Sequence, residues 1–184
     1  MNLRALLALV FIGAAPAWAQ NLPPATPARD VDVTYRAGQG NRVMEQRSRF
    51  QASGQRVRVD TPTPGVYAIM DLRARTLAMV SDAERAVLDM PSPAGGMAPG
   101  APSAGRFVRR GADRVAGLPC TEWETTDSTG QPILACYTDD GVMLRARRGA
   151  QVLVAATRVT YAVQDPALFV VPAQYAHTSP RDPR

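Results

Sequence analysis

Alternation of apolar and polar residues recurs along this chain, and no long stretch after the first twenty residues carries the 3.6-residue period of an amphipathic helix. Val31, Val33 and Tyr35 alternate with polar neighbours, and Val57 and Val59 do the same. Such alternation is typical of half-buried strands. Segment 66–70 is apolar on both sides, which predicts a central strand. Further strands are expected at 76–80, 86–90, 106–110, 121–126, 133–137, 142–147 and 151–163.

Short turn signals separate these segments. Asp140-Gly141 is a strong hairpin signal, because its turn needs positive φ at both central positions. About ten strands joined by short turns predict an antiparallel meander and not alternating βαβ units. We therefore expect a mainly β fold with little helix apart from the signal peptide. The meander either closes into a barrel or, as we favour, curls into an open half-barrel around a small cover element.

The N-terminus has the layout of a secretory signal peptide. One positive charge, Arg4, precedes an apolar run at 5–15, and Ala17-Trp18-Ala19 is the small-x-small pattern before a cleavage point. That run is too short to span a bilayer, and no later stretch is long or apolar enough. We expect cleavage after Ala19 and a periplasmic protein without a transmembrane segment.

The expected domain organisation follows from composition. Residues 1–19 are the signal peptide, 20–30 a linker, 31–175 a single open-barrel domain and 176–184 a disordered tail. Segment 91–105 contains only Pro, Gly, Ala, Ser and one Met. It cannot bury enough surface to hold a fixed shape, so we predict a flexible loop, either a passive connection or a flap over a cavity. Asp165-Pro166 can start one helical turn that plugs the barrel end with Leu168 and Phe169.

Two cysteines flank a hairpin signal at Asp127–Gly130. Folding the chain about Ser128 places Cys120 opposite Cys136, as a cross-strand disulfide requires. Such a bond persists in an oxidising compartment, which agrees with export. Redox-active pairs usually have Cys-x-x-Cys spacing, so we interpret this pair as structural.

Arginine supplies all 21 basic residues, and the net charge is only +5. Acidic residues are interleaved, and the aromatic–basic pattern of RNA-binding modules is missing, so no nucleic-acid partner is indicated. Arginines two residues apart lie on one side of a strand. We expect this side to be the outer face of the sheet, either as a solvated surface or as a face for anionic lipid or an acidic partner. Its members are Arg47, Arg49, Arg56, Arg58, Arg73, Arg75, Arg145 and Arg147.

A second set of side chains would point to the concave side or the core. These residues either pack the core or line a site for an apolar ligand. They are Tyr35, Val57, Val59, Tyr67, Ile69, Leu77, Met79, Trp123 and Phe169.

No catalytic or metal-binding constellation is present in the sequence. A serine triad needs a histidine base, and the one histidine, His177, lies in the expected tail. Two cysteines and one histidine do not form a metal cluster. The carboxylate pairs Glu122/Glu124 and Asp139/Asp140 suit a solvated strand face and a turn. We expect no enzyme, no metal and no cofactor.

Several segments carry a family resemblance: Val33-Thr34-Tyr35, Gln55–Asp60, an Ile69-x-Asp71 hairpin continuing to Thr76, Val115–Cys120, and Asp165–Pro172. Together they resemble an uncharacterised family of exported bacterial proteins allied to the LolA/LolB-like lipoprotein carriers. The resemblance implies an open antiparallel β-barrel with a hydrophobic cavity and no chemistry of its own. The chain departs from the true carriers in having the 91–105 loop instead of cover helices. This difference counts against transfer of lipoproteins as its specific function.

The leading functional expectation is therefore a non-enzymatic periplasmic protein that binds an apolar or lipid-like ligand, such as a lipid or lipoprotein acyl chain, in the concave face of an open β-barrel. The alternative is a structural or interaction module of the cell envelope, with a filled barrel and an arginine-rich face for anionic lipid or an acidic partner.

Overall fold

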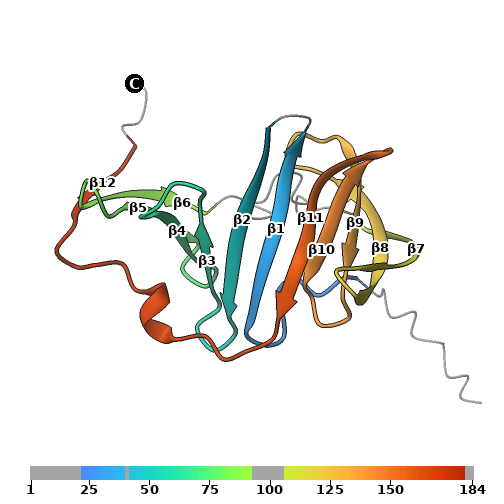
Figure 1. Cartoon of the computed structure of the whole chain (residues 1–184), viewed down its shortest axis with the longest axis horizontal. Helices are drawn as coiled ribbons and strands as arrows, with labels where there is room; N and C mark the ends of the chain where they lie inside the picture. The colour runs from blue at the N-terminus through green and yellow to red at the C-terminus, as the bar shows by residue number, and fades with distance from the viewer. Residues whose placement is uncertain (1–21, 40–41, 93–105, 181–184) are drawn as a thin grey trace, which may run out of the picture.

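A single twelve-stranded sheet dominates the computed structural model, which describes residues 22–39, 42–92 and 106–180 (Figure 1). Neighbouring strands run in the order β12-β6-β5-β4-β3-β2-β1-β11-β10-β9-β8-β7. The strands are β1 (Val31–Gln39), β2 (Arg42–Gln51), β3 (Arg56–Asp60), β4 (Val66–Asp71), β5 (Thr76–Ser81), β6 (Ala86–Pro91), β7 (Val108–Val115), β8 (Leu118–Thr126), β9 (Pro132–Tyr137), β10 (Met143–Arg148), β11 (Gln151–Thr160) and β12 (Ala176–Thr178).

Two antiparallel meanders make up this sheet, β1–β6 and β7–β11. They join where β11 pairs with β1. The last strand, β12, runs parallel to β6. The two edges, β12 and β7, do not pair with each other, so the sheet is open. The expected mainly β, open and curled sheet is confirmed.

Some strands differ from the expected ranges. Strand β2 was not among them, because Gln46 and Ser48 take inward positions beside Tyr35 and Val33 and interrupt the apolar alternation. Strand β7 begins and ends later than the expected 106–110, and its exposed residues carry no apolar pattern.

The C-terminal tail also differs. Residues 176–178 are not disordered but form β12, because the edge of β6 offers backbone groups that a further strand can bond. The signal peptide, residues 20–21 of the linker, residues 93–105 of the predicted loop and residues 181–184 lie outside the described residues. Among the described residues, no helix has the length and hydrophobicity needed to cross a membrane.

The β1–β6 half has one apolar side, which we call the apolar face. Cross-strand partners lie on the same side of a sheet, so the register defines this face in two rows. One row is Ser48, Val59, Ala68, Met79 and Leu88, and the other is Phe50, Val57, Met70, Leu77 and Met90. Half of these residues are buried: Phe50 belongs to a cluster with β1 residues, and Val59, Ala68, Met70 and Leu77 form a second cluster within β3–β5.

The opposite side, which we call the arginine face, carries Arg47, Arg49, Arg56 and Arg58. The C-terminal segment 164–178 runs from the end of β11 past β3–β5 to β12 (Figure 1) and packs against this side of β4–β6. There Tyr67, Ile69, Val80 and Val87 are buried against Val171 and Tyr175. Strand β4 is thus buried on both sides, as expected for a central strand.

A short 3-10 helix, η1 (Pro166–Phe169), begins this C-terminal segment. The Asp165 carboxylate accepts a hydrogen bond from the N–H of Ala167 and caps its start (2.9 Å). The helical turn expected from Asp165-Pro166 is confirmed. Phe169 is 2 % exposed.

Gly141 lets the N-terminal linker pass close to the β9–β10 turn. Its φ is +92°, and a Cβ there would lie 2.4 Å from the carbonyl oxygen of Thr26. A side chain is excluded both by the left-handed backbone and by this contact. The N–H of Ala28 donates to the carbonyl of Asp140 (2.8 Å), which holds the linker beside the turn.

Candidate functional site

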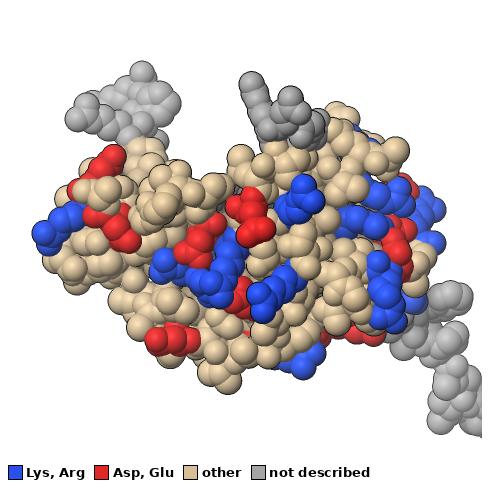
Figure 2. All heavy atoms as spheres, viewed as in Figure 1, with Lys and Arg blue, Asp and Glu red and all other residues tan. Residues whose placement is uncertain are grey.

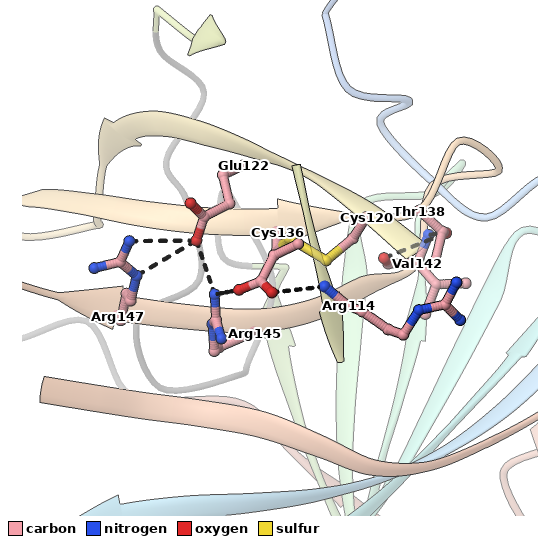
Figure 3. Close-up of a disulfide and its surroundings, with 9 residues drawn as sticks. Arg114, Cys120, Glu122, Cys136, Thr138, Val142, Arg145 and Arg147 are labelled. Carbon is pink, nitrogen blue, oxygen red and sulfur yellow. Dashed lines mark hydrogen bonds and ion pairs between the residues drawn. A yellow bond between two sulfur atoms is a disulfide. The ribbon is translucent and has the colours of Figure 1, made fainter. Parts of the chain in front are cut away.

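The β8–β9 hairpin carries the disulfide Cys120–Cys136, with the two Cα atoms 5.5 Å apart (Figure 3). The pairing is as expected, but the register is not. Cys136 pairs with Glu122, so the cysteines are diagonal neighbours instead of direct partners. The reason is the turn: Thr126 pairs with Pro132, which centres the hairpin on Thr129 and not on Ser128. Both cysteines are buried in the main core cluster.

Asp127 sets that turn. Its Oδ1 accepts hydrogen bonds from the hydroxyl of Thr129 (2.6 Å) and from the N–H groups of Thr129 and Gln131 (2.9 and 3.0 Å). Its other oxygen pairs with Arg148. The Thr129 hydroxyl, followed by the Gln131 and Thr129 amides and Arg148, lowers the pKa of the carboxyl to about 2. The carboxylate therefore stays charged and holds the turn.

Beside the disulfide, arginines of β10 meet carboxylates from other strands (Figure 3). Arg145 contacts Asp113 (2.5 Å) and Glu122 (2.8 Å), and Arg147 contacts Glu122 (3.3 Å). The N–H of Arg114, together with Arg145, lowers the pKa of Asp113.

This cluster shows which way the sheet curls. Asp113 is on β7, and Arg145 is on β10, three strands away. Three strand spacings are about 14 Å, more than an arginine and an aspartate can span across a flat sheet. The β7–β11 half therefore curls toward Arg145 and Arg147. Their expected place on an outer face is wrong: they lie on the concave side of this half.

The remaining arginines of the predicted face also contact carboxylates. Arg47 contacts Asp32 (2.5 Å), Arg49 pairs with Asp60, and Arg58 contacts Asp60 (2.8 Å). Arg56 contacts Asp71 (3.2 Å). Figure 2 shows positive and negative side chains interleaved on this side of the molecule. An external anion would have to compete with these carboxylates.

Arg73 and Arg75 are not strand residues. They lie in the turn between β4 and β5, where Arg75 has a φ of +56°. The two-residue spacing therefore does not place them on one side of a strand, and this expectation is wrong for them.

The nine expected ligand-lining residues are divided between the two sides of the sheet. Tyr35, Val57, Val59, Leu77 and Met79 share the apolar face. Tyr67 and Ile69 pair with Asp60 and Arg58 on the opposite side, where the C-terminal segment covers them. Both are buried in a core cluster, which is one of the two placements expected, but on the other side of the sheet from the first group, because β4 is apolar on both sides and alternation could not orient it.

Phe169 belongs with that second group: together with Ile69 it lines a pocket of about 300 Å³ beneath the C-terminal segment. Tyr35 is fixed within the core, where its hydroxyl donates to the carbonyl of Met143 (2.7 Å) and burial raises its pKa.

Strand β7 is a candidate site that the sequence patterns did not single out. It pairs with β8 alone among the described residues, and its six central residues are exposed. Four arginines at 106, 109, 110 and 114, against one acid, Asp113, were the available signal.

Two pockets flank this strand. The first, about 280 Å³, is lined by Arg109, Trp123 and Tyr137 together with linker residues 22–24. The second, about 540 Å³, is lined by Arg106, Arg110 and Thr125 among others. Thr125 is 4 % exposed, and its hydroxyl has no hydrogen-bond partner in the described part of the chain.

Acidic and metal-ligating side chains do not converge on a metal site within residues 22–39, 42–92 and 106–180. No group of three or more His, Cys, Asp or Glu side chains there could hold a metal ion. His177 contacts Asp89 (2.7 Å) at the β12–β6 edge.

No protein-family model matches the sequence, and no curated protein matches it either. Solved structures do match. An uncharacterized conserved protein from Thermus thermophilus has a TM-score of 0.58 at 11% identity, covering 83% of this chain and 91% of that one. PNGF-II has a TM-score of 0.53 at 13% identity, and the match covers 83% of this chain but only 31% of that protein.

MucB is a further structural neighbour. MucB in complex with MucA(peri) matches with a TM-score of 0.52 at 15% identity over 83% of this chain, and the Pseudomonas aeruginosa MucA/MucB complex with 0.53 at 14% identity over 82%. The chain spans 57% and 58% of those two matched chains. At these identities the likeness concerns the fold alone. It agrees with the open curled sheet that the resemblance to LolA/LolB-like carriers implies.

Proposed function

We propose that this chain is an exported, non-enzymatic protein of the cell envelope that acts by binding a partner protein. One observation carries the proposal: most of the side chains expected to line a ligand cavity have almost no exposed surface that a ligand could contact. Seven of those nine residues are at most 8 % exposed. They are Tyr35, Val59, Tyr67, Ile69, Leu77, Trp123 and Phe169.

Export is supported by the signal-peptide pattern of residues 1–19 and by the Cys120–Cys136 disulfide. Disulfides persist in oxidising compartments such as the periplasm. A protein partner is supported by the fold neighbour MucB, which is seen in complex with MucA(peri). The open sheet also has a strand, β7, with a free edge within the described chain.

The test is native mass spectrometry of the mature chain after in-cell cross-linking and purification from envelope extracts. We expect a defined complex with one protein partner, and reconstitution of that complex from separately purified components. Recovery of the chain alone with a stoichiometric acyl lipid, and no protein complex, would refute the proposal.

A second candidate function is binding of an apolar chain on the apolar face. The observation that favours it is partly exposed apolar surface at the β5–β6 end of that face, where Leu88 is 37 % exposed and Met79 and Met90 are half-buried. Leu88→Glu should then abolish uptake of a fluorescent fatty acid. Val152→Glu is the matched control, because Val152 is 44 % exposed on β11 and lies outside this face. Equal uptake by both variants would exclude the apolar face as the site.

The arginine face as a docking surface for anionic lipid gains less support. Its strand-borne arginines contact carboxylates of the same chain, which partly neutralise the positive charge that this face presents to an external anion. Salt-sensitive sedimentation with vesicles of anionic phospholipid, absent with neutral vesicles, would favour this alternative.

A further inference from the structure

Strand β7 is an open edge of the sheet, whereas at the other end of the sheet the three-residue strand β12 pairs with β6. Strand β6 is partly covered by β12, which pairs with Ala86, Val87 and Leu88. Within the described residues β7 is hydrogen-bonded to a single strand, β8; it also comes close to β11, but residues 109–114 are exposed. An edge of this kind presents unpaired backbone N–H and C=O groups to another strand.

Charge selects the kind of strand that fits. Segment 106–115 has four arginines and one aspartate, a net charge of +3. Asp113 is already engaged by Arg145, and Arg110 by Glu124. Arg106 and Arg109 are exposed and form no ion pair within the described chain. A second copy of this edge would be repelled, whereas an acidic segment would be attracted.

The two pockets beside β7 provide room for side chains of an added strand. Side chains of a bound strand alternate between the two sides of a sheet, and pockets on these sides give such binding its selectivity. One pocket is lined by Arg109 beside the Trp123 and Tyr137 rings, and the other is lined by Arg106 and Arg110.

We propose that β7 accepts an extended, acidic segment of a partner protein as an additional strand of the sheet. This inference rests on the proposed partner-binding function and names the site and the chemistry of the partner. The competing explanation is that the arginines only prevent edge-to-edge association, which is a common role of charge on edge strands.

A designed peptide tests the edge directly. The probe alternates glutamate with valine or threonine and matches the eight residues of β7 in length. Its control has the same sequence and charge but carries N-methyl groups at alternate backbone positions, so that it cannot bond the edge. We expect the probe to slow amide exchange in β7 at least about tenfold, as a newly protected strand would. The N-methylated control should bind at least about tenfold more weakly, because backbone bonds supply the affinity in strand addition.

Charge-reversal variants localise the binding. Arg109→Glu should weaken probe binding, whereas Arg158→Glu should not, because Arg158 is an exposed β11 residue distant from the edge in strand order. Equal binding of the probe and its N-methylated control, or no binding of either up to concentrations on the order of 1 mM, overturns the strand-addition proposal. If Arg109→Glu dimerises and the wild type does not bind the probe, the arginines only prevent edge-to-edge association, and the strand-addition proposal is wrong.

Failure of this proposal is distinguishable from failure of the proposed function. If a native partner is captured and Arg109→Glu binds it as tightly as the wild type, partner binding stands and the β7 site is wrong. If no partner is captured and a lipid is found instead, the proposed function itself is wrong.

Discussion

Replacing the disulfide in the double variant Cys120→Ala/Cys136→Ala should lower the stability of the domain markedly. The bond joins residues with a sequence separation of 16. The chain-entropy relation gives about 3 kcal/mol for closing a loop of this length in the unfolded state. In a domain of this size that loss lowers the Tm by about 6 to 12 °C.

The assay is reversible urea unfolding of the oxidised mature chain and of the variant. With a slope of about 1–3 kcal/mol per molar urea, the midpoint should fall by about 1–3 M. The reduced wild-type chain is the matched control, since it lacks the bond but keeps both sulfur atoms in the core. A variant as stable as the oxidised wild type, within about 0.5 kcal/mol, would refute the structural role given to this bond.

Three further predictions concern single side chains. The Asp127 carboxyl has a pKa of about 2 in the folded chain and an ordinary value near 4 in the unfolded chain, so the stability that it supplies is present above about pH 4 and is lost as the pH falls toward 2. Asp127→Asn should therefore be less stable than the wild type at pH 7 and lose less stability between pH 4 and pH 2, as measured by urea unfolding at each pH. Phe169→Ala should cost about 3 kcal/mol or more and expose the C-terminal segment to limited proteolysis, because Phe169 is 2 % exposed; unchanged stability and protection would contradict this packing. Arg145→Gln should lower the free energy of unfolding by about 1–2 kcal/mol, since Glu122 loses its shortest ion contact. Arg158→Gln is the control: Arg158 has no ion pair in the described chain, so this variant should stay within about 0.5 kcal/mol of the wild type. An equal loss in both variants would refute the stabilising role given to the Arg145–Glu122 contact.

Alternation was a sound guide where one side of a strand is apolar and the other polar. Val57 and Val59 share one side, with Arg56 and Arg58 on the other, as their spacing indicated. It failed where a strand is buried on both sides. Tyr67 and Ile69 could not be assigned a side from β4 alone, because the C-terminal segment that covers them comes from about 100 residues away in the sequence.

The arginines illustrate the same limit. Their two-residue spacing indicated a shared side for Arg145 and Arg147, but not that this side is concave. That property depends on the curl of β7–β11, which brings Asp113 within 2.5 Å of Arg145. The candidate site at β7 was likewise invisible to apolar patterns, since an edge is defined only by the strand order of the complete sheet.

By itself, the sequence determined the class of the fold, the meander and the partners in the disulfide, because strand periodicity, turn residues and cysteine spacing are local properties. The tertiary structure decided the hairpin register, the side on which each β4 residue lies, the engagement of the arginines with carboxylates and which strand remains an edge. These features depend on contacts between segments distant in the chain, and no local pattern records which segments will meet.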